Sequence, residues 1–215
     1  MAPLHVCCMQ HAQEQASVHS LTRCCCHLMH ATLVDTAVSA ALIFYSVDRA
    51  SFSSVSEQAF FAVFHAISAF CNAGFSTLSG SLQEGSFEFN YGLQVIVALT
   101  FILGGLGFPI VENIISYLKY KTNQLFTFSK TINYRPWVLN LNSRIALITS
   151  ALLTAGGFIA FYALEYHNTL VRHNDMGKLV TAFFGAVTPR TAGFNTVDTA
   201  SLLFPTTLLL FFLMW

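Results

Sequence analysis

The stretch FHAISAFCNAGFSTL at Phe64–Leu78 recurs 119 positions later as FFGAVTPRTAGFNTV at Phe183–Val197. Each copy has an apolar segment, too short to cross a membrane, that reaches an Ala-Gly-Phe triplet and continues as Ser/Thr/Asn-rich chain. Irregular backbone at membrane depth is tolerated only where protein buries it or where it lines a water-filled cavity. A half-helix that ends there directs the negative end of its dipole at that point, which favours a cation. A single copy is equally compatible with a surface helix that ends in a glycine cap, but the duplication favours two pore loops.

The composition indicates an all-α integral membrane protein. Of the 215 residues, 54% are hydrophobic and only 9% are charged, whereas soluble domains carry about 25% charged residues. Lys and Arg together number 10, as do Asp and Glu, so no net charge favours a nucleic-acid partner. We therefore expect a multi-pass protein of the cell membrane, with lipid as its surroundings.

The apolar runs predict the same unit twice: a spanning helix, a half-helix with its loop, and a second spanning helix. We expect spans at 24–47, 91–111 and 145–164, and half-helices at 57–71 and 179–187. Asp35 lies inside the first span, where a carboxylate usually faces a bundle interior or water. A fourth span begins near Leu202 and stops at Trp215, so we expect that the last helix is truncated.

These elements divide the chain into four parts. They are an atypical polar N-terminus at 1–23, a first repeat at 24–118, a basic linker at 119–144 and a second, truncated repeat at 145–215. The stretch 113–144 has five basic residues and no acid, so the positive-inside rule places it in the cytoplasm. Acids occur in 79–90 and 165–178, which we expect on the opposite side of the membrane. Both half-helices would then enter from that outer side.

The N-terminus is rich in residues that bind metals, but their spacing does not fit a zinc site. Adjacent pairs and triplets of Cys differ from the usual CxxC and HxxxH spacings. A membrane metalloprotein or redox protein using this segment stays an alternative, as does lipidation of one Cys. The residues concerned are Cys7, Cys8, Cys24, Cys25 and Cys26, with His5, His11, His19, His27 and His30.

Three segments resemble the Trk/Ktr/HKT superfamily of K⁺ transporters, whose pore is built from four helix–pore-loop–helix repeats. FHAISAFCNAGFSTLSGSL at 64–82 is similar to the second pore loop of that family, and AVTPRTAGFNTVDTASL at 186–202 is similar to the third. GGLGFP at 104–109 resembles the segment that follows the second loop. The resemblance implies that about two of the four repeats are present, and thus a fragment of a K⁺ transporter.

The resemblance also implies roles for particular residues. Gly74 and Gly193 match the selectivity-filter glycines, and backbone carbonyls around them would replace the hydration shell of K⁺. Arg190 would be a structural tie near the filter, with Asp198 as its partner, since a cation in the ion path would repel K⁺. The residues expected to bind the ion are Asn72, Ala73, Gly74, Phe75, Thr191, Ala192, Gly193 and Phe194.

Family members work as homodimers with cytoplasmic nucleotide-binding regulatory subunits, so we expect both partners here. No cofactor is expected, and K⁺ is the transported ion. The family residue that separates K⁺ from Na⁺ belongs to the first repeat, so both ions stay candidates.

Two alternatives to an ion pathway are disfavoured, and three side chains near the loops have expected structural roles. A water or small-solute channel would have half-helices that enter from opposite sides, which the single basic loop disfavours. No Ser/His/Asp set, P-loop or HExxH motif is present, so an enzyme is not expected. We interpret His65 as a packed, hydrogen-bonded side chain, and we expect Phe75 and Phe194 to wedge their loops against neighbouring helices.

Overall fold

The computed structural model describes residues 29, 32–107, 141–191 and 193–214, and every regular element in them is helical. The expectations for the Cys/His-rich N-terminus and for most of the basic linker lie outside these residues. In chain order the elements are the helix Thr32–Ser46, η1 (Arg49–Ser51), α2 (Val55–Phe70), η2 (Ser81–Gln83), η3 (Gly85–Phe87), α3 (Tyr91–Leu106), α5 (Leu141–Glu165), η4 (Thr169–Arg172), α6 (Asp175–Thr191), η5 (Thr199–Ser201) and α7 (Phe204–Met214).

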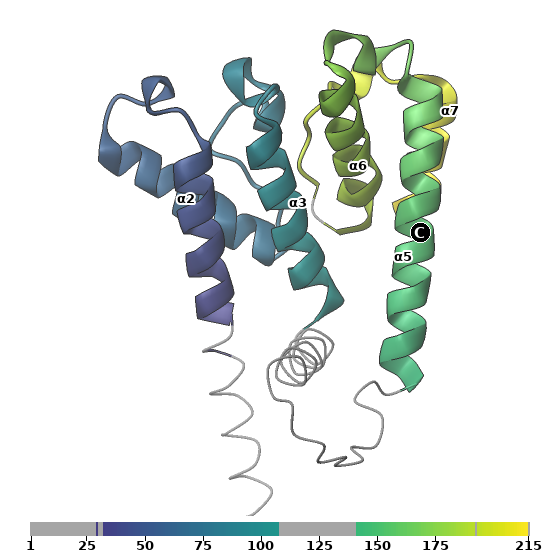
Figure 1. The fold of residues 1–215 in the computed structure, drawn as a ribbon, viewed down its shortest axis with the longest axis horizontal. Coiled ribbons are helices and arrows are strands. Elements are labelled where there is room, and N and C mark those ends of the chain that lie inside the picture. Colours follow the sequence, from purple (N-terminus) through teal and green to yellow (C-terminus); the bar gives the residue numbers. More distant parts are fainter. Residues whose placement is uncertain (1–28, 30–31, 108–140, 192, 215) are drawn as a thin grey trace, which may run out of the picture.

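Figure 1 shows α3, α6 and α5 side by side. α3 packs against both α2 and α6, while α5 packs against α6 and α7. The main hydrophobic core is shared between the two halves of the chain, since Phe61 and Phe101 lie in the same cluster as Phe184 and Phe194. The ring of Phe101 meets that of Phe184 edge to face, with centroids 5.6 Å apart.

One described helix is long and apolar enough to cross a membrane. It covers Arg144–Glu165 with a mean hydropathy of 1.9, which agrees with the span expected at 145–164. The helices Thr32–Ser46, α2, α3 and α7 are apolar but shorter. The span expected at 91–111 is too long, because α3 ends at Leu106 and Gly107 takes a φ of 80°, which ends a helix.

The half-helices are longer than expected because their caps lie further upstream. α2 begins two residues early, since the Ser54 hydroxyl accepts from the Glu57 N–H at 3.2 Å while the Glu57 carboxylate accepts from the Ser53 N–H at 2.9 Å. α6 begins four residues early, at Asp175, because the Asn174 side chain accepts from the Gly177 N–H at 2.9 Å.

The ends of α2 and α3 approach each other closely. A Cβ added at Gly104 of α3 would collide with the carbonyl oxygen of Phe70, the last residue of α2. Only glycine allows this backbone contact. It fixes the position at which α2 gives way to the first glycine loop.

Candidate ion site at two glycine loops

The first loop begins where α2 runs out of helical hydrogen bonds. Asn72 has a φ of 52° and Gly74 a φ of 71°, so the chain turns through left-handed conformations on both sides of Ala73. The Ala73 N–H donates back to the Ser68 carbonyl at 2.9 Å. The Ser68 hydroxyl donates to the Phe75 carbonyl at 2.7 Å. α2 therefore holds the loop by a backbone bond and a side-chain bond.

The second loop turns in a comparable way after α6. Gly193 has a φ of 78°, and its N–H donates to the Thr188 carbonyl, five residues back, at 3.4 Å. The bond from Ala73 to Ser68 in the first loop has the same five-residue span. The two glycines matched in sequence thus share a positive φ, each just after a helix C-terminus that carries the negative end of a dipole.

The two loops are joined directly. The Asn195 N–H donates to the hydroxyl of Ser81, at the start of η2, at 3.2 Å. Thr196 and Val197 from the second loop line a cavity of about 580 Å³ together with Ser79 and Gly80 from the first. The structure therefore brings the predicted segments to one place, although they are more than 100 residues apart.

The eight residues expected to bind the ion divide as follows. Asn72, Ala73, Gly74 and Phe75 lie in the first loop, and Gly193 and Phe194 lie in the second. Thr191 is the last residue of α6, and Ala192 lies outside the described residues. The Phe75 carbonyl already accepts a bond from Ser68, which leaves it one further lone pair.

Phe75 and Phe194 differ in their burial. Phe194 is fully buried and belongs to the shared core, as expected of a wedge. Phe75 is 70% exposed, so the prediction that it packs against neighbouring helices of this chain is wrong.

Arg190 is a structural tie, but to α5 and not to Asp198. Its guanidinium donates to the Ser150 carbonyl at 3.0 Å, the Thr154 hydroxyl at 2.9 Å and the Ser150 hydroxyl at 3.0 Å. The Asp198 carboxylate instead accepts from the Ala200 N–H at 3.0 Å and caps η5. The predicted Arg190–Asp198 pair is therefore wrong, because the helix carries Arg190 toward the middle of α5.

His65 has the packed role expected of it. The side chain is fully buried, and its ring nitrogens lie 2.9 Å from the Phe61 carbonyl and 2.9 Å from the Ser76 hydroxyl. Its ring lies 3.9 Å from that of Phe61 and 6.1 Å from that of Phe194, centroid to centroid. His65 thus connects α2 with both loops.

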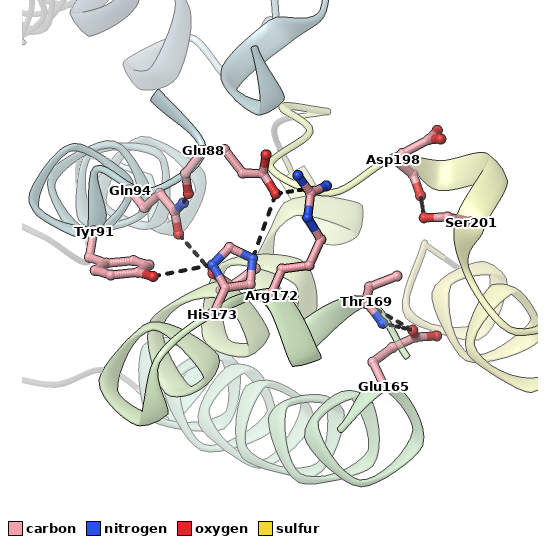
Figure 2. A network of polar contacts seen from close by, with 10 residues as sticks. Glu88, Tyr91, Gln94, Glu165, Thr169, Arg172, His173, Asp198 and Ser201 are labelled. Carbon is pink, nitrogen blue, oxygen red and sulfur yellow. Dashed lines mark hydrogen bonds and ion pairs between the residues drawn. The ribbon is translucent and has the colours of Figure 1, made fainter. Parts of the chain in front are cut away.

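A polar layer near the loops was not anticipated, and Figure 2 shows part of it. Glu165, at the end of α5, is fully buried. Its carboxylate accepts from Asn168 at 2.8 Å, the Thr169 hydroxyl at 2.9 Å and the Leu203 N–H at 3.0 Å. From the sequence, Glu165 was expected only as an acid of the outer segment 165–178. The signal for its role was the Asn and Thr three and four positions later.

The polar layer also connects the two halves of the chain. His173, after η4, lies with its Nδ1 3.3 Å from the Tyr91 hydroxyl and its Nε2 4.0 Å from the Glu88 carboxylate (Figure 2). Arg172 lies 3.5 Å from the same Glu88 oxygen. Burial lowers the pKa of His173, against the opposing effect of Glu88. The segments 79–90 and 165–178 therefore lie on the same face, as expected.

Acidic side chains face the 580 Å³ cavity between the loops. Glu84, Glu88 and Asp198 line it, together with Arg172 and His173. The Gly80 N–H and the Ser79 hydroxyl donate to Glu84 and lower the pKa of that carboxyl below its ordinary value. Within the described residues, no group of three or more His, Cys, Asp or Glu could hold a metal ion.

Replacing Arg190 with Lys is expected to destabilise the chain. Lys keeps the charge, but a single ammonium lacks the planar fork that reaches Ser150 and Thr154 together. Loss of one or two bonds to a charged donor costs roughly 2–4 kcal/mol. Thermal unfolding in detergent should show a clear fall in the midpoint for Arg190→Lys. Arg172→Lys is the matched control, because the Arg172 side chain is 70% exposed. Equal midpoints for the two variants would contradict the structural role of Arg190.

Stability is expected to fall on acidification through the titration of His173. Its pKa in the folded chain lies below the ordinary 6.5, so the unfolded chain binds the proton first as the pH falls. The stabilisation is complete above about pH 6.5 and is lost progressively below it. Unfolding midpoints between pH 5 and 8 should show a shallower dependence in His173→Gln than in the parent chain. His167→Gln, at an exposed residue of the same outer segment, is the control. An unchanged slope in His173→Gln would exclude this residue as the source.

Comparison with known proteins finds a matching family model and several relatives. A family model described as a cation transport protein, TrkH, matches residues 7–215. The match therefore extends into the N-terminal segment, beyond the three segments that carry the resemblance. The potassium/sodium uptake protein NtpJ of Enterococcus hirae is 37% identical over 156 residues, which cover 72% of this chain and 31% of that protein.

Two further relatives are named Ktr system potassium uptake protein B. The one from Vibrio alginolyticus is 35% identical over 166 residues, covering 72% of this chain and 31% of the relative. The one from Bacillus subtilis is 34% identical over 145 residues, covering 66% and 28%. The chain spans about a third of the length of these relatives. It belongs to the TrkH family of cation transport proteins.

Proposed function

We propose that this chain forms part of a transmembrane pathway for K⁺, with the two glycine loops as part of its selectivity filter. The observation that carries the proposal is the matched backbone of Gly74 and Gly193, with φ values of 71° and 78°, each just beyond the C-terminus of a half-helix. The names of the relatives, which concern potassium uptake, support K⁺ as the transported ion.

The chemistry of the loops suits a weakly hydrated alkali cation. The loops offer backbone carbonyls, and two helix C-termini add negative potential at the same place. Arg190, in the last turn of α6, makes three hydrogen bonds to α5, which fix its guanidinium as a structural tie. The cavity lined by Glu84, Glu88 and Asp198 would concentrate cations in front of the loops.

The proposed architecture is two helix–pore-loop–helix repeats of a larger ring in a multi-pass protein of the cell membrane. Two loops cannot surround an ion, so further pore loops would complete the filter in the assembled transporter. We extend the proposal to a homodimer and to a cytoplasmic nucleotide-binding regulatory subunit, since 113–144 carries five basic residues and no acid. An enzymatic role is not part of the proposal.

The proposed sidedness predicts which residues are reached from outside the cell. Single cysteines at Ser86 and Asn123, in a transporter otherwise free of Cys, should behave oppositely toward a membrane-impermeant maleimide. Ser86, on the exposed outer turn, should react in intact cells, and Asn123, in the basic linker, should react only after permeabilisation. Strong labelling of Asn123 in intact cells would overturn the orientation.

The filter role predicts that alanine at the two matched glycines impairs K⁺ transport. The test protein is a chimaeric transporter in which residues 24–215 replace the aligned stretch of the Enterococcus hirae relative. At positive φ a Cβ costs about 1–2 kcal/mol, a factor of roughly five to thirty if the conducting conformation bears that cost. A Cβ on Gly193 would have no atom within 4 Å, so the strain there is purely that of the backbone.

The measurement is Rb⁺ uptake and K⁺/Na⁺ preference at matched surface expression. Gly74→Ala and Gly193→Ala should lower both, whereas Gly80→Ala and Gly156→Ala should not. Gly80 has a φ of −97°, and a Cβ on Gly156 would lie in open space. Normal selectivity in both Gly74→Ala and Gly193→Ala would mean that these loops are not the filter.

A further inference from the structure

We propose that the side chain of Asn72 is a positioning residue that couples the first glycine loop to the glycine-rich end of α3. The inference rests on the proposed function, because it assigns a role within the proposed filter. It concerns the amide of Asn72, whereas the filter role concerns only its backbone carbonyl.

The amide binds two backbone atoms of α3 at once. Its nitrogen donates to the Phe101 carbonyl at 3.0 Å, and its oxygen accepts from the Gly105 N–H at 3.1 Å. The opposite orientation of the amide would place donor against donor and acceptor against acceptor. The two backbone partners on α3 therefore determine the orientation of the amide. In a regular α-helix the N–H of residue 105 bonds to the carbonyl of residue 101. Asn72 therefore holds both members of one helical hydrogen-bond pair.

That pair lies where α3 is least able to stay helical. Gly104 and Gly105 occupy its last turn, and Gly107 leaves the helix with a φ of 80°. Gly104 also contacts the Phe70 carbonyl with no room for a Cβ. The end of α3 is thus attached to the base of the loop by a backbone contact and by the Asn72 amide.

A side chain that binds both atoms of a helical pair lets the helix bend there at low cost. In a membrane a freed N–H or C=O has no water to bind, and a neighbouring side chain must satisfy it. Asn72 can follow such a bend only if the loop moves with it, because Gly74 and Phe75 are two and three residues away. The conformation of the loop and that of the end of α3 therefore change together.

Asparagine suits position 72 in both its backbone conformation and its side-chain hydrogen bonds to α3. A φ of 52° is unfavourable for most side chains and is tolerated by Gly and Asn. Asn alone of these two carries an amide that both donates and accepts. Substitution with Gly therefore separates the two roles, since it keeps the backbone conformation and removes the tie.

The test compares Asn72→Gly with Ser86→Gly in the chimaeric transporter at matched surface expression. Ser86 is exposed on the outer turn η3 and controls for the added glycine. We expect Asn72→Gly to lower the K⁺/Na⁺ preference about three- to tenfold, the effect of losing one or two neutral hydrogen bonds. Ser86→Gly should match the parent. A parent-like preference and uptake in Asn72→Gly would overturn the inference.

Asn72→Asp is a second variant of nearly the same size, in case Asn72→Gly does not reach the membrane. It keeps the oxygen that accepts from Gly105 but places a carboxylate against the Phe101 carbonyl, so its preference should fall at least as far. A parent-like preference in Asn72→Asp would also overturn the inference.

A double-mutant cycle tests coupling itself. Gly107→Ala strains the end of α3, because a Cβ there has open space but an unfavourable φ. If the tie couples the two ends, the effects of Asn72→Gly and Gly107→Ala on preference are non-additive, and additive effects contradict it. The assays of Gly74→Ala and Gly193→Ala distinguish failure of this inference from failure of the proposed function. If both glycine variants impair selectivity and Asn72→Gly does not, only the coupling role of Asn72 is refuted. If none of the three variants impairs selectivity, the filter role is refuted as well.

Discussion

Backbone hydrogen bonding is the constraint on which the rest of this structure depends. A chain that stops being helical inside a membrane leaves N–H and C=O groups that water cannot reach, and each costs several kcal/mol if unpaired. The two glycine loops exist only because nearby groups satisfy them. Ser68 serves the first loop by its carbonyl and its hydroxyl, and the Ser81 hydroxyl serves the Asn195 N–H of the second. In the proposed filter, the carbonyls left over are those that would face the ion.

The matched glycines of the two loops share a positive φ, but the loops differ in how they are supported. The first is held from the outgoing helix, where Asn72 binds the end of α3. The second is held from the incoming helix, where Arg190 binds Ser150 and Thr154 of α5. Phe194 is buried in the shared core and Phe75 is exposed. The two loops therefore make different contacts with the rest of the chain, so equal substitutions in them need not have equal effects.

The sequence predicted what depends on local pattern. The duplicated Ala-Gly-Phe, the half-helices before it and the long apolar helix that became α5 follow from periodicity and glycine chemistry. It did not predict partners distant along the chain. Arg190 finds Ser150 and Thr154 forty and thirty-six positions upstream, whereas sequence proximity suggested Asp198. A partner of this kind depends on the rotation of α6 against α5, which no local pattern encodes.

The predicted helix boundaries were wrong for a related reason. The half-helices were expected to begin at residues 57 and 179, but caps decide where a helix begins, and the capping side chains of Ser54 and Asn174 lie upstream of these positions. The end of α3 was misplaced because an apolar run continues through Gly107, while the φ of that glycine stops the helix.

Both halves of the chain also close their outer ends in the same manner. In the first, the Asn90 amide donates to the Ser46 carbonyl at 2.7 Å, while its oxygen caps α3 through the Leu93 N–H at 3.0 Å. In the second, Glu165 accepts from the Leu203 N–H, just before α7. Each joins the end of one helix to the start of another that flanks the loop. Since a loop can hold its carbonyls in register only if its two flanking helices are fixed, these partly buried polar contacts support the geometry of the proposed site from a distance.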